Sequence, residues 1–197
     1  MKTKSPLSAY ILCGGKSSRM GTDKGFVRFR DRSFTDWCLE AARQITKDIH
    51  LVTANKKYAQ FGYPLVEDIH KNKGPVGGIY TALENSATGW NLILSCDIPG
   101  ITGSLLNHLF ERTPEQTSIA FLSSGSNDYP LVAIYHKNCS KYFSEAIQEN
   151  DLRLMNVIGK LNYERIEIPF SESHNLNNIN TPEELEILKK TRYERYS

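Results

Sequence analysis

The sequence predicts one α/β domain of three layers, with a mostly parallel central sheet and helices on both of its faces. Short apolar runs typical of buried strands alternate along the chain with segments of helical apolar spacing. Ligand-type residues follow several of these runs directly, where open α/β sheets place their ligands. The length of 197 residues suits a single domain, so we expect one domain over residues 1–197.

The strands are predicted from the apolar runs. Residues 92–94 are continuously apolar, which is typical of a central parallel strand buried on both faces. Residues 26–29 alternate between apolar and cationic, as a short half-buried strand does, and residues 163–168 alternate as an outer strand does. Further strands are expected at 9–12, 49–52, 63–66, 119–122 and 131–135. Residues 123–128 are polar and contain glycine and serine, so they are expected to form a loop.

The helices are predicted from apolar residues at helical spacing. The first runs from residue 34 to 45, and Ser33 is its candidate N-cap. Others are expected at 79–83, 105–109 and 139–147. The last begins at Pro182, where Thr181 and Glu184 have the spacing of a capping box.

Composition excludes several classes of protein. The 24 basic and 22 acidic residues give a formal net charge of +2, without the basic excess of a nucleic-acid-binding domain. No apolar run approaches the ~20 residues that a membrane span needs, and residues 1–8 lack the apolar core of a signal peptide. The four cysteines are widely spread and form no metal-binding or disulfide pattern. We therefore expect a reduced cytoplasmic protein that binds neither nucleic acid nor membrane.

The stretch from Leu12 to Lys24 is the most informative part of the chain. Glycines here allow sharp turns and close approach to a ligand, and successive N–H groups can form an anion-binding concavity. Lys16, Arg19 and Lys24 add positive charge around it. The stretch therefore predicts a loop that binds a polyphosphate.

Two common phosphate-binding motifs do not fit this loop. A Walker A motif needs a glycine where Tyr10 stands. The dinucleotide fingerprint fails because Gly14 and Gly15 are adjacent and the third glycine is Gly21.

Asp68 and Asp97 each follow a predicted strand. Asp97 is well placed to hold Mg²⁺, which binds proteins through one or two carboxylates together with phosphate oxygens. A helix N-cap role is disfavoured, because Asp97 lies too far upstream of the helix expected after Ser104. Asp68 is either a ligand contact or an exposed turn residue, and position alone does not decide between them.

Residues 73–78 form a second glycine-rich turn, Lys-Gly-Pro-Val-Gly-Gly, before a predicted helix. Pro75 suits a first helical turn, and a helix N-terminus favours anions. Separately, residues 14–24, Asp68, Asp97 and Asn180 all follow predicted strands, so these ligand-type residues are expected to converge on one crevice.

The spacing Leu12-x-Gly14-Gly15-x-Ser17-x-Arg19-Met20-Gly21-x-Asp23-Lys24 resembles the signature of single-domain nucleotidyltransferases, and most of all that of the molybdenum cofactor guanylyltransferases. Residues 74–78 resemble the Gly-Pro-x-Ala/Gly-Gly segment of these enzymes, and Asn178 and Asn180 resemble their paired asparagines. The resemblance covers nearly the whole chain. It implies a Rossmann-like three-layer sandwich of the nucleotide-diphospho-sugar transferase type, with a nucleotide-binding half at about 8–100 and an acceptor-binding half at about 101–190.

The implied reaction is transfer of GMP from GTP to molybdenum-molybdopterin, which yields the guanine dinucleotide cofactor and pyrophosphate. Arg19, Lys24 and Asp97 are the implied catalytic residues, with Asp97 as the Mg²⁺ ligand. The implied GTP-binding residues are Leu12, Cys13, Gly14, Gly15, Arg19, Lys24, Thr53, Asp68, Gly78 and Asp97. The implied acceptor-binding residues are Asp128, Arg153, Asn178 and Asn180.

Five points stay open at this level. The family has an asparagine where Thr53 may fall, and Asn55 could substitute for it. Arg153 could contact an acceptor phosphate or be a solvated helix residue, and Asn180 may or may not complete the metal site. Proteins that deliver molybdopterin or receive the product are further possible partners. The alternatives for function are a related transferase that uses CTP or a sugar 1-phosphate, and a non-catalytic nucleotide-binding protein of the same fold.

Overall fold

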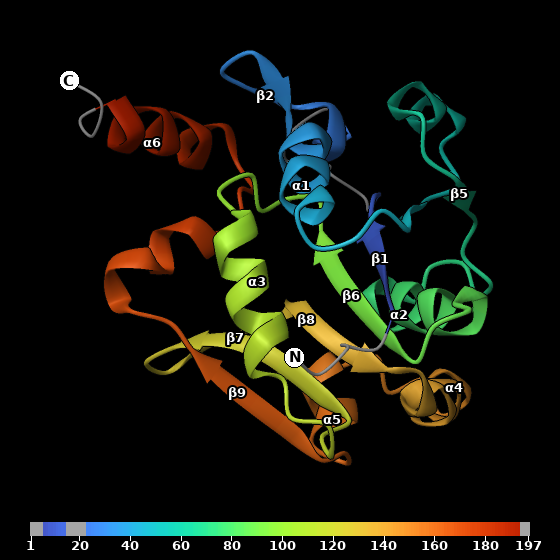
Figure 1. Ribbon diagram of the computed structural model, residues 1–197. Coiled ribbons are helices and arrows are strands. Elements are labelled where there is room, and N and C mark those ends of the chain that lie inside the picture. Colours follow the sequence, from blue (N-terminus) through green and yellow to red (C-terminus); the bar gives the residue numbers. More distant parts are fainter. Residues whose placement is uncertain (1–5, 15–22, 194–197) are drawn as a thin grey trace.

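The computed structural model describes residues 6–14 and 23–193, and a seven-stranded sheet forms the centre of this part of the chain (Figure 1). The spatial order of its strands is β5-β4-β1-β6-β8-β7-β9. In chain order they are β1 (Leu7–Leu12), β4 (Ile49–Val52), β5 (Leu65–Val66), β6 (Trp90–Ser95), β7 (Ile119–Ser124), β8 (Asn127–His136) and β9 (Tyr163–Glu167).

Most of the sheet is parallel, as the sequence predicts. β5, β4, β1 and β6 pair in parallel, and so do β7 and β9. β8 runs antiparallel to both of its neighbours, β6 and β7. The carboxyl ends of the parallel strands therefore share one edge, where β8 begins.

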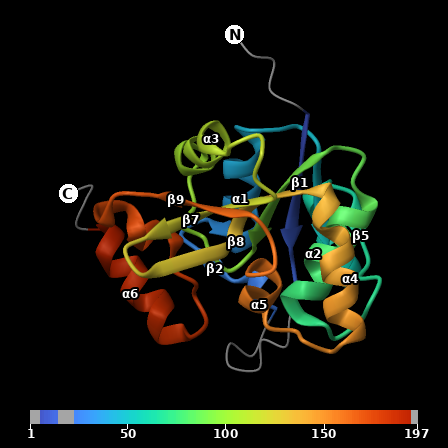
Figure 2. The ribbon, with the colours of Figure 1, turned by 90° about the horizontal axis from the view of Figure 1, so that it is seen from below.

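Helices cover both faces of the sheet. α1 (Phe34–Arg43) and α3 (Gly103–Arg112) pack on one face, where Ala9 and Ile11 of β1 meet Leu39 and Leu106. α2 (Gly74–Asn85), α4 (Ser140–Gln148) and α5 (Leu154–Ile158) pack on the other face. Figure 2 shows α1 and α3 on one side of the strands, and α2, α4 and α5 on the other. This arrangement is the expected three-layer α/β fold.

A small third core lies beyond the carboxyl edge of the sheet. The hairpin of β2 (Arg28–Phe29) and β3 (Arg32–Ser33) packs there against α6 (Pro182–Tyr193). Phe29 and Leu188 are the buried contacts that join them. In Figure 1 the β6 arrow points toward the side on which this hairpin and α6 lie. α6 thus lies at the edge at which the parallel strands end.

The local signals for helix starts are confirmed. The Ser33 side chain accepts a hydrogen bond from Asp36 N at 3.1 Å, and α1 begins at the next residue. At α6, Glu184 N donates to Thr181 Oγ1 at 3.2 Å, and Thr181 N donates to the Glu184 carboxylate at 3.1 Å. Short 3₁₀ turns occupy Lys24–Phe26, Lys56–Phe61, Lys137–Cys139 and Phe170–Leu176.

The loop expected at residues 123–128 is instead a tight hairpin between β7 and β8. Gly125 turns it with φ of +58°, a conformation that favours glycine. The Glu167 carboxylate of β9 accepts from Ser123 Oγ at 2.9 Å and from Gly125 N at 2.6 Å. These contacts come from a strand far along the chain, so the local composition gives no sign of them.

Other element boundaries also differ from the sequence prediction. The helix expected from residue 79 already begins at Gly74, because the glycine-proline turn is its first turn. The strand expected at 26–29 is reduced to Arg28–Phe29, since residues 24–26 form a 3₁₀ turn. The strand expected at 63–66 is reduced to Leu65–Val66. No helix within residues 6–14 and 23–193 is both long and apolar enough to cross a membrane.

Candidate active site

A cleft of about 670 Å³ opens where β1, β4 and β5 end and α2 begins. Six residues that the sequence implicated in nucleotide binding line this cleft: Leu12, Cys13, Gly14, Thr53, Asp68 and Gly78. They come from three strand ends and one helix, which is the convergence expected of a parallel sheet. Asp23, Asn55, Ser95 and Leu131 are among the other residues that line it.

Glycines allow the backbone to approach this cleft. Gly14 follows β1 with φ of +125°, a region that side-chain-bearing residues rarely adopt. At Gly78 of α2, an added Cβ would lie 3.2 Å from Leu12 Cδ2. The missing side chain therefore lets α2 pack directly on the end of β1, beside the cleft.

Asp68 brings a carboxylate to the wall of the cleft. Its Oδ1 atom is buried and finds no hydrogen-bond partner among the described residues. Burial raises the pKa of Asp68 above its ordinary value and nearby Glu67 adds to this shift, while the Thr81 side chain offsets part of it by a hydrogen bond. An unpaired buried acceptor costs free energy, so this carboxylate is suited to receive a donor from a bound ligand.

Cys13 lies at the cleft with its thiol deeply buried. Burial and the adjacent Cys96 raise the pKa of Cys13 well above its usual value. Cys38, Cys96 and Cys139 are also buried and free. The Cys13 thiol therefore stays neutral and acts as a small buried side chain at the end of β1.

Three predicted site residues from distant parts of the chain meet beside the cleft. Lys24 Nζ lies 3.1 Å from Asp97 Oδ2 and also donates to Asn180 Oδ1. Asp97 Oδ1 accepts from Ser95 Oγ at 2.6 Å, and Ser95 lines the cleft. A backbone hydrogen bond joins the same two segments, since Ile179 N donates to Asp97 O at 2.9 Å. The segment before α6 is thereby held against the end of β6.

This cluster fits a cation. The oxygens of Asp97 and Asn180 converge on a single positive group, the ammonium of Lys24. Carboxylate and amide oxygens are hard donors of the kind that Mg²⁺ prefers. Within residues 6–14 and 23–193, no group of three or more His, Cys, Asp or Glu side chains could hold a metal by itself. A metal bound at Asp97 would therefore need further oxygens, such as those of a phosphate.

The remaining predicted residues either fall outside the described part of the chain or do not line the cleft. Gly15 and Arg19 fall outside the described residues. Asp128 lies at the start of β8, where Arg165 Nε contacts it at 2.8 Å. Arg153 has an 82% exposed side chain, 3.3 Å from Asp151, and Asn178 is exposed on the segment before α6. The structure does not bring Asp128, Arg153 and Asn178 into the cleft lining.

Asn55, the suggested substitute for Thr53, has its side chain engaged in other bonds. Its Nδ2 donates to Asp23 Oδ2 at 3.0 Å, and its Oδ1 accepts from Lys57 N at 3.1 Å. Asp23 also lines the cleft, although the sequence motif gave it no role of its own. Its position in the motif next to Lys24 is the one signal that could have pointed to it.

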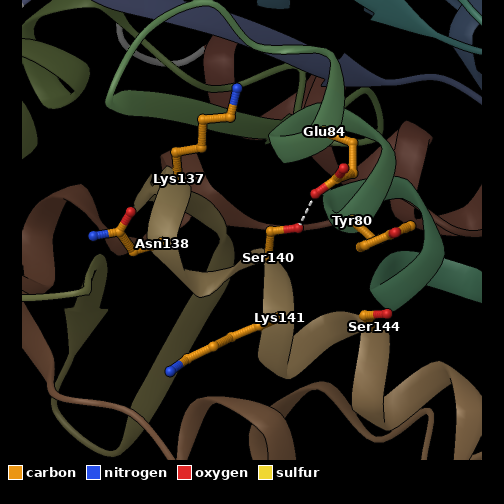
Figure 3. A pocket seen from close by; sticks show the side chains of 7 residues that line it. All are labelled: Tyr80, Glu84, Lys137, Asn138, Ser140, Lys141 and Ser144. Atoms are coloured by element: carbon orange, nitrogen blue, oxygen red, sulfur yellow. Dashed lines mark hydrogen bonds between the residues drawn. The ribbon is translucent and has the colours of Figure 1, made fainter.

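A second hollow of about 670 Å³ lies between α2 and α4. Figure 3 shows Ser140 pointing toward Glu84, while Lys141 points away from it. Lys137 at its edge donates to the backbone oxygen of Ser86. This hollow lies toward the amino end of β6, where His136 pairs with Trp90, and so at the opposite edge of the sheet from Asp97.

A cleft at the carboxyl edge of a mostly parallel sheet, with a cation position beside it, is the arrangement of an α/β enzyme that handles nucleotides. The comparison with family models narrows this class. The model of the MobA-like NTP transferase domain matches residues 9–164, and the chain belongs to this family.

Curated relatives extend over almost the whole chain. A Flavobacterium johnsoniae protein named probable molybdenum cofactor guanylyltransferase is 42% identical, covering 92% of this chain and 96% of its own length. A Clostridium perfringens protein of the same name is 31% identical over 93% of this chain and 96% of its own length.

Solved structures agree on the fold. The molybdopterin-guanine dinucleotide biosynthesis protein A of Archaeoglobus fulgidus superposes with a TM-score of 0.81 at 21% identity. The match covers 95% of this chain and 99% of that chain.

Proposed function

We propose that this protein transfers GMP from GTP to molybdenum-molybdopterin, forming the molybdopterin guanine dinucleotide cofactor and pyrophosphate. The observation that carries this proposal is the meeting of Lys24, Asp97 and Asn180 beside the cleft, in a chain whose relatives are named for this reaction. The reaction is a displacement at the α-phosphorus of GTP by the terminal phosphate of the acceptor.

The acceptor phosphate is already an anionic nucleophile, so no general base is required. Catalysis then depends on orienting the two phosphates and on neutralising the charge that develops on the leaving pyrophosphate. Lys24, with a side chain 20% exposed beside Asp97, supplies positive charge at this place. Backbone N–H groups of Gly14 and Gly15, together with Arg19, complete the proposed triphosphate site.

Mg²⁺ is the proposed metal, and Asp97 would hold it with help from Asn180. Bound there, it would neutralise negative charge on the α-phosphate and on the leaving group. Asp97 has further support from Ser95, whose hydroxyl donates to Oδ1 and leaves Oδ2 toward the cation position.

Asp68 is the proposed reader of the base, with Leu12 and Cys13 bordering the ring and Thr53 beside it. Guanine carries two neighbouring donors, N1–H and N2–H, which match the two oxygens of one carboxylate. Adenine and cytosine each place an acceptor next to their amino group, so they cannot make this paired contact. The Oδ1 atom of Asp68, which has no hydrogen-bond partner in the described part of the chain, therefore supports a preference for GTP over CTP and ATP.

The acceptor side is proposed to include Asn178, Asn180, Asp128 and Arg153. Leu131 of β8 lines the cleft, so β8 borders the proposed entry of the acceptor. Arg153 is exposed and could turn to a phosphate. We place the reaction in the cytoplasm, with a molybdopterin-delivering protein and molybdoenzymes as further partners.

The test is pyrophosphate release in the presence of Mg²⁺ and molybdenum-loaded molybdopterin, with GTP, CTP, ATP and UTP compared. The proposal expects release with GTP and its loss in Asp97→Asn. Release with CTP in place of GTP would keep the mechanism and overturn the product. Tight GTP binding without release from any nucleotide would favour another acceptor or a non-catalytic protein.

A further inference from the structure

The Asp23 side chain collects three hydrogen bonds at the end of the glycine loop. Its Oδ1 accepts from Tyr58 Oη at 2.5 Å and from Gly25 N at 3.2 Å. Its Oδ2 accepts from Asn55 Nδ2 at 3.0 Å. The donors come from two different segments, so Asp23 ties the residues around Lys24 to the chain that follows β4.

From this geometry we infer that Asp23 and Tyr58 are positioning residues that hold Lys24 beside Asp97 for contact with the nucleotide triphosphate. The inference rests on the proposed function, in which Lys24 binds the triphosphate. Tyr58 acts through Asp23 and the backbone of Lys24, and it touches neither the nucleotide nor the acceptor.

Tyr58 is suited to this role because its hydroxyl remains a donor. The side chain is completely buried, and burial, with Cys96 and Cys13 nearby, raises the pKa of Tyr58 well above its usual range. The hydroxyl therefore stays protonated and donates to the Asp23 carboxylate throughout the pH range of the protein. A hydrogen bond to a charged acceptor is stronger than one between neutral groups.

Gly25 fixes the other side of Lys24. An added Cβ at Gly25 would lie 2.0 Å from Tyr58 Oη and 2.7 Å from Thr35 Oγ1, so only glycine fits between these side chains. Thr35 Oγ1 in turn donates to Gly25 O at 2.9 Å. The residue after Lys24 is thus held between the side chains of Tyr58 and Thr35.

The same contacts link the two ends of the nucleotide cleft. Asn55 N donates to Thr53 Oγ1 at 3.1 Å, and Thr53 lines the cleft where the base is proposed to bind. The Asn55 side chain then reaches Asp23 at the phosphate end. Hydrogen bonds through Asn55 would therefore connect the residues proposed to bind the base with those proposed to bind the triphosphate.

The test is a double-mutant cycle on GTP binding. Affinity for GTP with Mg²⁺ is measured by calorimetry for Tyr58→Phe, Lys24→Gln and the double variant. We expect Tyr58→Phe to weaken binding about tenfold when Lys24 is present, and to have almost no effect in the Lys24→Gln background. The value of kcat should fall in the same pattern.

Tyr135→Phe is the matched control. Tyr135 is also completely buried, and its hydroxyl donates to Pro130 O at 2.8 Å rather than to the site. This variant should lose stability without a change in GTP affinity. If Tyr58→Phe fails to fold, Asn55→Ala removes another donor to Asp23 from a half-buried position and should give the same non-additive result.

Two results would overturn the inference: an unchanged GTP affinity in Tyr58→Phe, or an equal loss with and without Lys24. The binding measurement needs no acceptor, so it decides this point even if no GMP is transferred. A wild-type protein that binds GTP but transfers nothing would defeat the proposed function alone. A wild-type protein that binds no nucleoside triphosphate would defeat both.

Discussion

At the residue scale, Asp68 illustrates how a proposed ligand-binding group lowers the stability of the folded protein. Its buried Oδ1 lacks a hydrogen-bond partner within residues 6–14 and 23–193, and burial raises the pKa of this carboxyl. The free protein therefore carries an unfavourable charge that a bound donor would relieve. Such strain is typical of sites that are complete only with their ligand.

We expect Asp68→Asn to weaken GTP binding by about tenfold to a hundredfold, because an amide presents one acceptor where the carboxylate presents two. Affinity for the triphosphate part should be retained, so binding of CTP should change much less. Calorimetric titration with both nucleotides checks this. An equal loss of affinity for GTP and CTP would show that Asp68 does not read the base.

The same substitution has a predicted pH signature. Because the pKa of Asp68 is raised in the folded state, folding favours its protonated form, and the stability this provides is lost as pH rises through the raised value. Asp68→Asn should therefore be more stable than wild type near neutral pH. The difference should vanish below about pH 3.9, the ordinary pKa of an aspartate. Urea unfolding of the nucleotide-free proteins at several pH values measures it, and a constant difference would contradict it.

At the element scale, helix starts position the site. α2 begins at the cleft, and Gly78 in its second turn lies against Leu12 at the end of β1. α6 begins where Asn180 meets Lys24. In both cases the start of a helix positions a residue of the candidate site. A change in the helix should therefore alter GTP binding or turnover.

Gly78→Ala tests the first of these contacts. The new Cβ would lie 3.2 Å from Leu12 Cδ2, so Leu12 must move at the border of the cleft. Alanine favours a helix by about 1 kcal/mol over glycine, which offsets the crowding in the free energy of unfolding. We expect little change in stability and about a fivefold weaker binding of GTP. A large loss of stability with unchanged GTP affinity would contradict this.

Glu184→Ala tests the second. The Glu184 carboxylate accepts from the backbone N–H groups of Asn180 and Thr181, so it fixes the residue whose side chain meets Lys24. We expect a loss of about 1 kcal/mol in stability from the broken cap. A fall in pyrophosphate release should accompany it. Glu183→Ala, in the same helical turn but exposed, is the control and should change neither quantity by as much.

At the scale of the whole molecule, the sequence predicted the fold and six of the residues that line the cleft. Buried runs such as residues 92–94 identify strands, and topology then brings the residues that follow them to one edge. Gly14 and Asp68 could be placed together for this reason, whereas Leu12 and Gly78 were implied by the family resemblance. Contacts between residues far apart in the sequence could not be predicted in this way. Tyr58 meets Asp23 from 35 residues away, and no local pattern marks a tyrosine as the partner of a loop.

The nucleotide half expected at 8–100 and the acceptor half expected at 101–190 are joined in the structure. β6 of the first half pairs with β8 of the second, and one hydrophobic core includes Ile11, Leu94 and Leu122. Asn180 of the second half completes the cluster around Lys24 of the first. The two halves therefore share both a sheet and a site, and neither buries its own core alone.

We accordingly expect one cooperative unfolding transition, in which GTP bound at the edge protects both halves equally. At a hundredfold excess over the dissociation constant, GTP with Mg²⁺ should add about 2.7 kcal/mol to the stability. Hydrogen exchange of the amides in β1 and β7 measures this in each half separately. Protection that rises by the same amount in both strands indicates one folding unit. An increase confined to β1 would show that the nucleotide half unfolds independently, because only a half with its own folding equilibrium could gain stability from the nucleotide without sharing it.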